Sequence, residues 1–84
     1  MTTVRLYTTR NCAYCVAAKR WLTQVKGVAY EEIDVSGDPA ARAWLRKTTG
    51  RSTVPQIFVG DTSVGGYTDL RALDARGELD PLLA

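Results

Sequence analysis

The stretch TTRNCAYCVAAKR, residues 8–20, decides how this chain folds and works, because it holds both cysteines and the start of a helical pattern. Cys12 and Cys15 are separated by two residues, and the chain has no histidine. A pair with this spacing can bind a metal, form a structural crosslink, or carry electrons as a redox-active pair. The residues around the pair favour one of these roles.

The spacing of apolar residues after the first cysteine predicts a helix from Ala13 to about Gly27. Its expected inward face consists of Cys15, Ala18, Leu22 and Val25. Cys12 then lies at the helix N-terminus, where unpaired amides and the helix dipole stabilise a thiolate, and Arg10 and Lys19 add positive charge nearby. We therefore expect the exposed Cys12 to attack disulfides and the shielded Cys15 to resolve the resulting mixed disulfide.

The other two roles for the pair are less favoured. A closed zinc site needs about four ligands, and one chain with two cysteines and no histidine cannot supply the usual set. A buried, inert pair remains open, although two cysteines on a strand-to-helix turn fit it less well. A structural disulfide is unlikely to persist in a reducing compartment, which is where we expect this chain.

The patterns on either side of the cysteine stretch predict the order β-α-β-α-β-β-α. The expected strands are residues 4–7, 29–35, 56–59 and 62–64, with a Gly60-Asp61 turn joining the last two. Two helical crossovers and one hairpin imply an α/β fold with a mixed four-stranded sheet and helices on both faces.

The remaining helices are placed by their start and stop residues. The second is expected to begin at an Asp38 cap with Pro39 in its first position, and to end at Gly50. Its expected inward face consists of Ala41, Trp44, Leu45 and Thr48. The third helix is expected to begin at a Thr68 or Asp69 cap and to end at Gly77, and residues 80–83 add a short turn.

Length and composition describe an ordinary globular chain. Its 84 residues are enough for a single domain, residues 1–84, with 45% apolar and 24% charged residues. A formal net charge of +2, with acids and bases interspersed, argues against nucleic-acid or membrane partners. Since the chain starts directly with a strand-like segment and no apolar signal core, we expect a cytoplasmic protein.

Three motifs in this order resemble those of the glutaredoxins, members of the thioredoxin-fold superfamily. They are Cys12-Ala13-Tyr14-Cys15, Thr53-Val54-Pro55 and Gly65-Gly66-Tyr67-Thr68-Asp69. The tail LRALDARGELDPLL, residues 70–83, also looks like that of small bacterial dithiol glutaredoxins. The resemblance covers essentially the whole chain and implies a thioredoxin fold. It also implies a glutathione-dependent thiol–disulfide oxidoreductase, which reduces protein disulfides and glutathione mixed disulfides.

The resemblance also implies a glutathione site. In the family Pro55 would be a cis-proline beside the cysteines, which leaves the Val54 backbone free to pair with an extended thiol peptide. The amides of Thr68 and Asp69 would hold the γ-glutamyl carboxylate, and the Asp69 side chain would hold its ammonium group. The full set expected to bind glutathione is Tyr14, Arg42, Thr53, Val54, Pro55, Gly66, Tyr67, Thr68 and Asp69.

The cation for the glycine carboxylate of glutathione is less clearly marked. Many family members have a lysine three residues before the first cysteine, where this chain has Thr9. Arg42 corresponds to another position that family members use and is the favoured cation, with Arg10 or Arg51 as substitutes. A simply solvated arginine stays open as the alternative.

The partners implied are glutathione as reductant, glutathione reductase indirectly, and disulfide-containing or glutathionylated proteins, with the chain acting as a monomer. One alternative is a thioredoxin-like donor recharged by a flavin reductase. Another is a [2Fe–2S] carrier, in which Cys12 and glutathione from two chains ligate the cluster, with no metal bound by the monomer. The cluster alternative is suggested by Ala13, because many dithiol members of the family have proline at that position.

Overall fold

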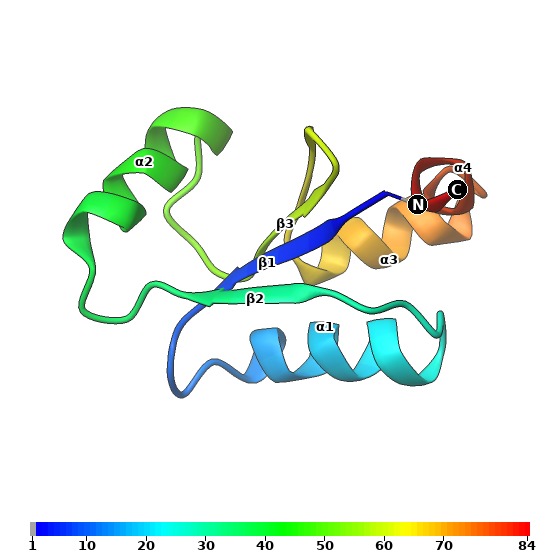
Figure 1. The fold of residues 1–84 in the computed structure, drawn as a ribbon, viewed down its shortest axis with the longest axis horizontal. Coiled ribbons are helices and arrows are strands. Elements are labelled where there is room, and N and C mark those ends of the chain that lie inside the picture. Colours follow the sequence, from blue (N-terminus) through cyan, green and yellow to red (C-terminus); the bar gives the residue numbers. More distant parts are fainter. Residues whose placement is uncertain (1) are drawn as a thin grey trace.

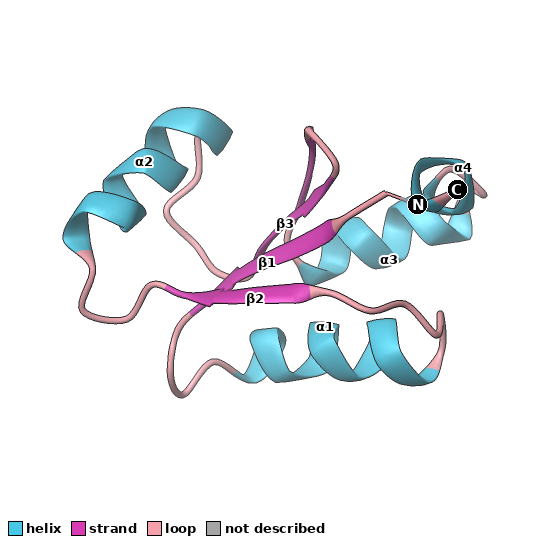
Figure 2. Cartoon of the chain, in the orientation of Figure 1, coloured by secondary structure: helices cyan, strands magenta, loops and turns pink. Residues whose placement is uncertain are grey.

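The computed structural model describes residues 2–84, a mixed four-stranded sheet with helices on both faces (Figure 1, Figure 2). The strands are β1 (Val4–Thr8), β2 (Glu31–Asp34), β3 (Gln56–Val59) and β4 (Thr62–Gly65). The helices are α1 (Ala13–Gln24), α2 (Pro39–Thr49), α3 (Tyr67–Ala75) and α4 (Leu79–Leu83). The predicted element order is confirmed, and α4 forms where the final short turn was expected. Among residues 2–84, no helix combines the length and apolar character that crossing a bilayer requires.

The strand order across the sheet is β2-β1-β3-β4. β1 pairs in parallel with β2 through the α1 crossover, whereas β3 is antiparallel to both β1 and β4. The prediction that β2 begins at residue 29 is wrong by two residues, because its pairing with β1 starts at Arg5 opposite Glu31. The residues just before Glu31 instead line a surface hollow with Thr2 and Thr3.

The inward face of α1 differs from the prediction at one position. Its buried residues are Cys15, Ala18, Trp21 and Leu22. Val25 is 64% exposed because the helix ends at Gln24 and the chain turns away before the stripe is complete. Trp21 is buried instead, and the charged groups of Lys26 and Arg71 lie 5.9 and 5.4 Å from the centre of its ring.

The ends of α2 are as predicted, but its inward face is narrower. The Asp38 side chain accepts a hydrogen bond from the amide of Ala41, and Gly50 ends the helix with φ +75°. Of the four residues expected to face inward, Leu45 is buried and Ala41 is partly buried, whereas Trp44 and Thr48 are exposed. The helix packs on the sheet through Leu45 and Ala41, and the Trp44 ring, although 46% exposed, lies 5.6 Å from that of Tyr7.

The start of α3 also differs from the prediction. Its N-cap is Gly66, and neither Thr68 nor Asp69 occupies that position. Asp69 is the third residue of the helix, and its Oδ2 accepts a hydrogen bond of 2.9 Å from the Gly66 amide. An acidic side chain three residues into a helix satisfies an amide at its start in this way, so the carboxylate caps from inside the helix.

Two apolar cores lie on the two faces of the sheet. Because successive side chains of a strand point to opposite faces, Leu6 and Ile57 join the core under α1 and α3, while Tyr7 and Phe58 join the core under α2. Figure 1 shows α1 and α2 on opposite sides of the sheet. The larger core fixes α1, and with it the position of the cysteine pair.

Leu22→Ala is expected to lower the free energy of unfolding by about 2–5 kcal/mol, because Leu22 is fully buried and the change leaves a cavity. Val25→Ala in the same helix is expected to change it by about 0.5 kcal/mol or less, because Val25 is exposed. Urea denaturation of both variants measures the difference. Equal losses would show that Val25 is packed and that the end of α1 is misplaced.

Candidate active site

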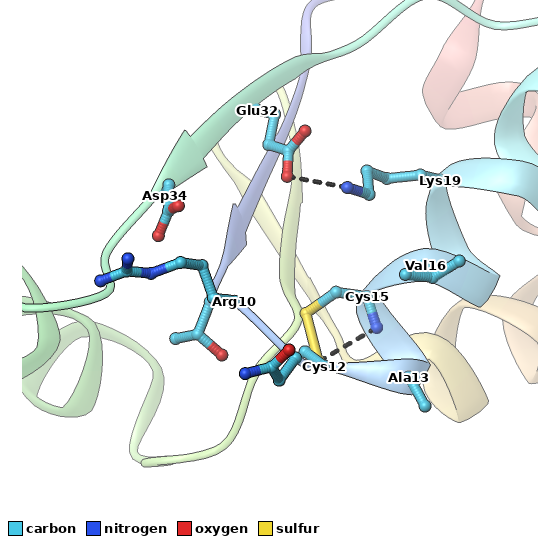
Figure 3. Close-up of a pocket in the computed structure, with 10 residues that line it drawn as sticks. Arg10, Cys12, Ala13, Cys15, Val16, Lys19, Glu32 and Asp34 are labelled. Atoms are coloured by element: carbon cyan, nitrogen blue, oxygen red, sulfur yellow. Dashed lines mark hydrogen bonds and ion pairs between the residues drawn. A yellow bond between two sulfur atoms is a disulfide. The ribbon is translucent and has the colours of Figure 1, made fainter.

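The two cysteines are joined in a disulfide at the N-terminus of α1, with their Cα atoms 5.2 Å apart (Figure 3). Cys12 is the N-cap of α1, and the amide of Cys15 donates a hydrogen bond of 3.1 Å to its Sγ. Cys12 is half-buried, whereas Cys15 is 1% exposed, so the predicted difference in accessibility is confirmed. In the reduced protein the same amide and the helix dipole would stabilise a thiolate on Cys12.

The loop before β3 lies against this disulfide. The Val54–Pro55 peptide bond is cis, as the resemblance implied. The carbonyl oxygen of Val54 is 3.7 Å from the Sγ of Cys12. Pro55 is buried and Val54 is half-buried, so the backbone of this loop forms one wall beside the reactive sulfur.

Gln56 holds this loop in place and was not recognised from the sequence. Its side chain is fully buried, and its Nε2 donates to the Thr53 carbonyl oxygen at 2.9 Å and to Thr53 Oγ1 at 3.4 Å. Its Oε1 is buried and has no hydrogen-bond partner among residues 2–84. The available signal was a polar side chain at the start of the otherwise apolar strand QIFV.

A cleft of about 400 Å³ lies between this loop and the start of α3. It is lined by Tyr14, Arg51, Thr53, Val54, Pro55, Gly66, Tyr67, Thr68 and Asp69. The fold therefore gathers every residue predicted to bind glutathione except Arg42, although the residues come from distant parts of the chain. Tyr14 and Tyr67 face each other across it, with ring centres 6.4 Å apart.

Asp69 is the only carboxylate among the residues lining this cleft, and it is tightly held. Its Oδ2 accepts hydrogen bonds from Arg51 at 2.5 Å and from the Gly66 amide. The Arg51 guanidinium and then the Gly66 amide lower the pKa of Asp69, so its charge persists into acidic solution. Gly65 makes this geometry possible: its φ is +103°, and a Cβ there would lie 2.6 Å from Asp69 Oδ2.

The three candidate cations lie in different places. Arg51 lines the cleft and pairs with Asp69. Arg42 lies outside the lining, and its guanidinium donates to the Ser52 carbonyl oxygen at 3.0 Å, one residue before Thr53. Arg10 lies on the other side of the disulfide.

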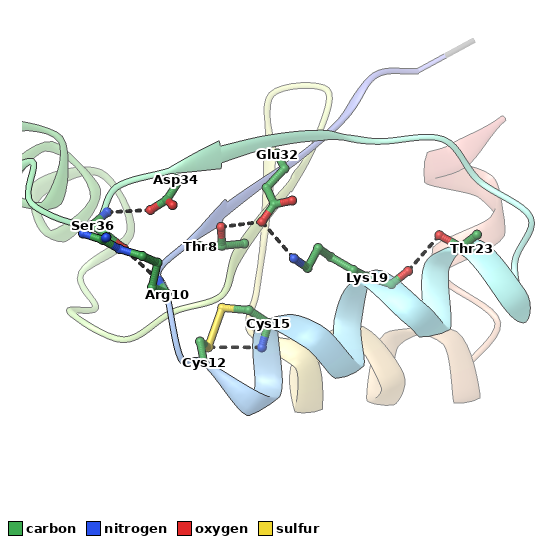
Figure 4. Close-up of polar contacts among 9 residues, drawn as sticks. All are labelled: Thr8, Arg10, Cys12, Cys15, Lys19, Thr23, Glu32, Asp34 and Ser36. Atoms are coloured by element: carbon green, nitrogen blue, oxygen red, sulfur yellow. Dashed lines mark hydrogen bonds and ion pairs between the residues drawn. A yellow bond between two sulfur atoms is a disulfide. The ribbon is translucent and has the colours of Figure 1, made fainter.

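A second hollow, of about 600 Å³, opens on that other side (Figure 3). It is lined by Thr9, Arg10, Asn11, Cys12, Ala13, Cys15, Val16, Lys19, Glu32 and Asp34. Lys19 Nζ lies 2.9 Å from Glu32 Oε2, and Thr8 Oγ1 donates to the same oxygen at 2.8 Å (Figure 4). Hydrogen bonds from Lys19 and then Thr8 lower the pKa of Glu32. The sequence alone did not pair these groups.

The metal-ligating side chains of the described part of the chain are not clustered. Within residues 2–84 no group of three or more His, Cys, Asp or Glu side chains is placed to hold a metal ion. A [2Fe–2S] cluster would therefore need thiolates from a second chain or from glutathione in addition to Cys12.

Comparison of the sequence with protein families and with known proteins finds clear relatives of this chain. The glutaredoxin family model matches residues 4–64. Glutaredoxin 3 of Escherichia coli K12 is 49% identical over 83 residues, which cover 99% of this chain and 99% of that protein.

Solved structures of glutaredoxins also resemble this fold. The solution structure of glutaredoxin from Brucella melitensis has a TM-score of 0.86 and 47% identity, covering 99% of this chain and 89% of that one. The crystal structure of a buckwheat glutaredoxin–glutathione complex has a TM-score of 0.86 and 27% identity, covering 98% of this chain and 76% of that one. The predicted thioredoxin fold is thus confirmed. This chain belongs to the glutaredoxin family, and its Cys12–Cys15 pair makes it a thiol–disulfide oxidoreductase.

Proposed function

We propose that this glutaredoxin uses glutathione to reduce protein disulfides and glutathione mixed disulfides. The observation that carries the proposal is the cleft between the loop before β3 and the start of α3, because its polar groups suit an extended, charged thiol tripeptide and its Val54 wall lies against Cys12. The similar buckwheat glutaredoxin forms a complex with glutathione, which supports the same ligand here.

In the reaction with a glutathionylated protein, the Cys12 thiolate attacks the glutathione sulfur. The bond between that sulfur and the protein cysteine breaks, and the protein thiolate leaves with the electron pair and takes a proton. The glutathione held on Cys12 is then attacked by a second glutathione thiolate. Glutathione disulfide is released and the Cys12 thiolate is restored, so this route needs only one cysteine.

In the reaction with a protein disulfide, Cys12 forms a mixed disulfide with the substrate. The Cys15 thiolate attacks the Cys12 sulfur, which releases the second substrate thiolate and forms the Cys12–Cys15 disulfide. Two glutathione molecules then return the pair to its dithiol form.

The cleft offers partners for the backbone and the γ-glutamyl end of glutathione, and Arg42, outside its lining, is the partner we propose for the glycine end. An extended backbone can pair with Val54, while the amides of Thr68 and Asp69 in the first turn of α3 suit the γ-glutamyl carboxylate. The Asp69 carboxylate suits the ammonium group, and Arg51 beside it lies at this same end. We therefore assign the glycine carboxylate to Arg42, which lies next to the loop at Ser52.

Cys12→Ser is expected to abolish release of glutathione from a glutathionylated peptide, because it removes the attacking thiolate. Cys15→Ser is expected to retain much of that activity, because the one-cysteine route does not use Cys15. A coupled assay with glutathione, glutathione reductase and NADPH measures both. Full activity of Cys12→Ser would overturn the proposal.

The same assay separates glutathione from a flavin-reductase donor. Wild-type protein is incubated with NADPH, a protein disulfide, and either glutathione plus glutathione reductase or thioredoxin reductase without glutathione. Faster turnover with thioredoxin reductase would favour the thioredoxin-like alternative over glutathione.

Asp69→Asn is expected to raise the KM for a glutathionylated peptide about tenfold or more, because a charged hydrogen bond contributes about 1.5–3 kcal/mol. Since the pKa of Asp69 is lowered, the wild-type KM should stay flat as the pH falls from neutral into the mildly acidic range. The control is Asp61→Asn, an exposed acid in the β3–β4 turn. An unchanged KM for Asp69→Asn would remove Asp69 from the site.

Arg42→Gln is expected to raise the KM for glutathione about threefold to tenfold, because it removes the partner of the glycine carboxylate. Glutathione ethyl ester, which lacks that carboxylate charge, should bind both proteins alike. Arg46→Gln, one turn along α2, is the matched control. An equal effect of Arg42→Gln on glutathione and on the ester would place the glycine end elsewhere.

A further inference from the structure

The buried cysteine of the pair has a charged neighbour on its own helix. Lys19 follows Cys15 by four residues in α1, so the two side chains project from the same face. Helical side chains lean toward the N-terminus, which turns the Lys19 side chain back toward the cysteine. Both residues line the hollow that opens opposite the glutathione cleft (Figure 3).

Lys19 is held in this position by two strands of the sheet. Its Nζ lies 2.9 Å from Glu32 Oε2 on β2, and that oxygen accepts a hydrogen bond of 2.8 Å from Thr8 on β1. Thr8 is 1% exposed and lies at the end of β1, so its hydroxyl is a fixed anchor. Figure 4 shows this Thr8–Glu32–Lys19 group beside the disulfide, on the side of Cys15.

Two other charged groups line the same hollow. Arg10 comes from the loop before Cys12, and Asp34 lies at the end of β2, where its Oδ1 accepts a hydrogen bond from the Ser36 amide. In Figures 3 and 4 the Arg10 and Asp34 side chains lie together at the end of β2, apart from the Lys19–Glu32 pair. Of the charged groups that line the hollow, only Lys19 shares a helix with Cys15.

We propose that Lys19 stabilises negative charge on Cys15 Sγ whenever the Cys12–Cys15 disulfide is made or broken, and that Glu32 and Thr8 are positioning residues for Lys19. The inference rests on the proposed glutathione reaction for its cellular role. Its chemical basis is that an ammonium group lines the same hollow as Cys15, whose sulfur has little access to water.

Glutathione reduces the Cys12–Cys15 disulfide by thiol–disulfide exchange. A glutathione thiolate attacks Cys12 Sγ, a bond forms between these two sulfurs, and the Cys12–Cys15 bond breaks. Cys15 leaves as a thiolate with the electron pair and then takes a proton from solvent through the hollow. In the opposite direction Cys15 must lose that proton to attack the Cys12 sulfur. In both directions the charge develops on Cys15, where the Lys19 ammonium favours it.

This role separates the two reactions of the enzyme. Reduction of a protein disulfide passes through charge on Cys15, whereas removal of glutathione from a single cysteine passes through Cys12 alone. The Cys12 sulfur is stabilised by the Cys15 amide and the start of α1. The ratio of the rate of protein-disulfide reduction to the rate of glutathione removal therefore depends on the charges around Cys15.

The test compares one variant that removes the positive charge of Lys19 with one that removes the negative charge of Glu32. Lys19→Met removes the favourable charge and leaves Glu32, so the ratio of disulfide reduction to glutathione removal should fall about threefold to tenfold. Glu32→Gln keeps an amide oxygen for Lys19 and Thr8 but removes the opposing charge, so the ratio should rise. Matched controls are Arg20→Met on α1 and Glu31→Gln on β2, which carry the same charge changes outside the lining of the hollow.

A second readout avoids glutathione altogether. In the Cys12→Ser background, the alkylation rate of Cys15 at constant pH follows the fraction of thiolate. Lys19→Met should lower this rate and Glu32→Gln should raise it, with urea denaturation used to verify that both remain folded. This readout keeps its meaning even if a different thiol proves to be the reductant.

Opposite signs for the two variants in this readout support the inference, because a merely structural ion pair would make both variants slower. Slower alkylation in both variants, or rates equal to those of the Arg20→Met and Glu31→Gln controls, overturns it. An equal fall in disulfide reduction and glutathione removal by Lys19→Met also overturns it.

Discussion

The hydrogen bond from the Cys15 amide to the Sγ of Cys12 is the interaction around which the site is organised. It makes the reactive sulfur the N-cap of α1, so that the first turn of the helix serves as both scaffold and electrostatic support. The same turn buries Cys15 against the core and leaves Cys12 half-buried, so only Cys12 is accessible to a substrate in the reaction we propose. The larger core holds α1 against β1 and β3, so it also holds the sulfur against the loop before β3.

Two hollows flank this disulfide, and their charges are arranged differently. The cleft toward α3 is lined by the first residues of α3, including the Asp69 carboxylate, and by the aromatic rings of Tyr14 and Tyr67. The hollow toward β2 presents the Lys19–Glu32 pair beside the buried sulfur. Substrate recognition and control of the resolving cysteine are thus assigned to opposite sides of one bond.

Predictions from the sequence were most reliable at helix ends where the backbone conformation or a hydrogen bond requires one particular type of residue. Helix α2 begins and ends as predicted, with Asp38 as its N-cap, Pro39 in its first position and Gly50 at its end. Side-chain capping, the fixed φ of proline and the left-handed conformation of glycine each depend only on neighbouring residues. Predictions of the inward face were less reliable near helix ends. Val25 continues the apolar stripe in sequence, but the helix stops before it, and the larger surface of Trp21 is buried instead.

The sequence by itself determined the chemistry: two cysteines at helix-start spacing, no histidine, and three motifs that resemble the glutaredoxins. It also determined the element order, because periodicity and turn residues act over short distances. Only the tertiary structure decided which polar and charged side chains meet. Arg51 pairs with Asp69, Gln56 holds Thr53, and Lys19 meets Glu32 and Thr8. Apart from the short Gln56–Thr53 link, these contacts join segments far apart in the chain. They depend on how strands and helices are stacked, which no local pattern records.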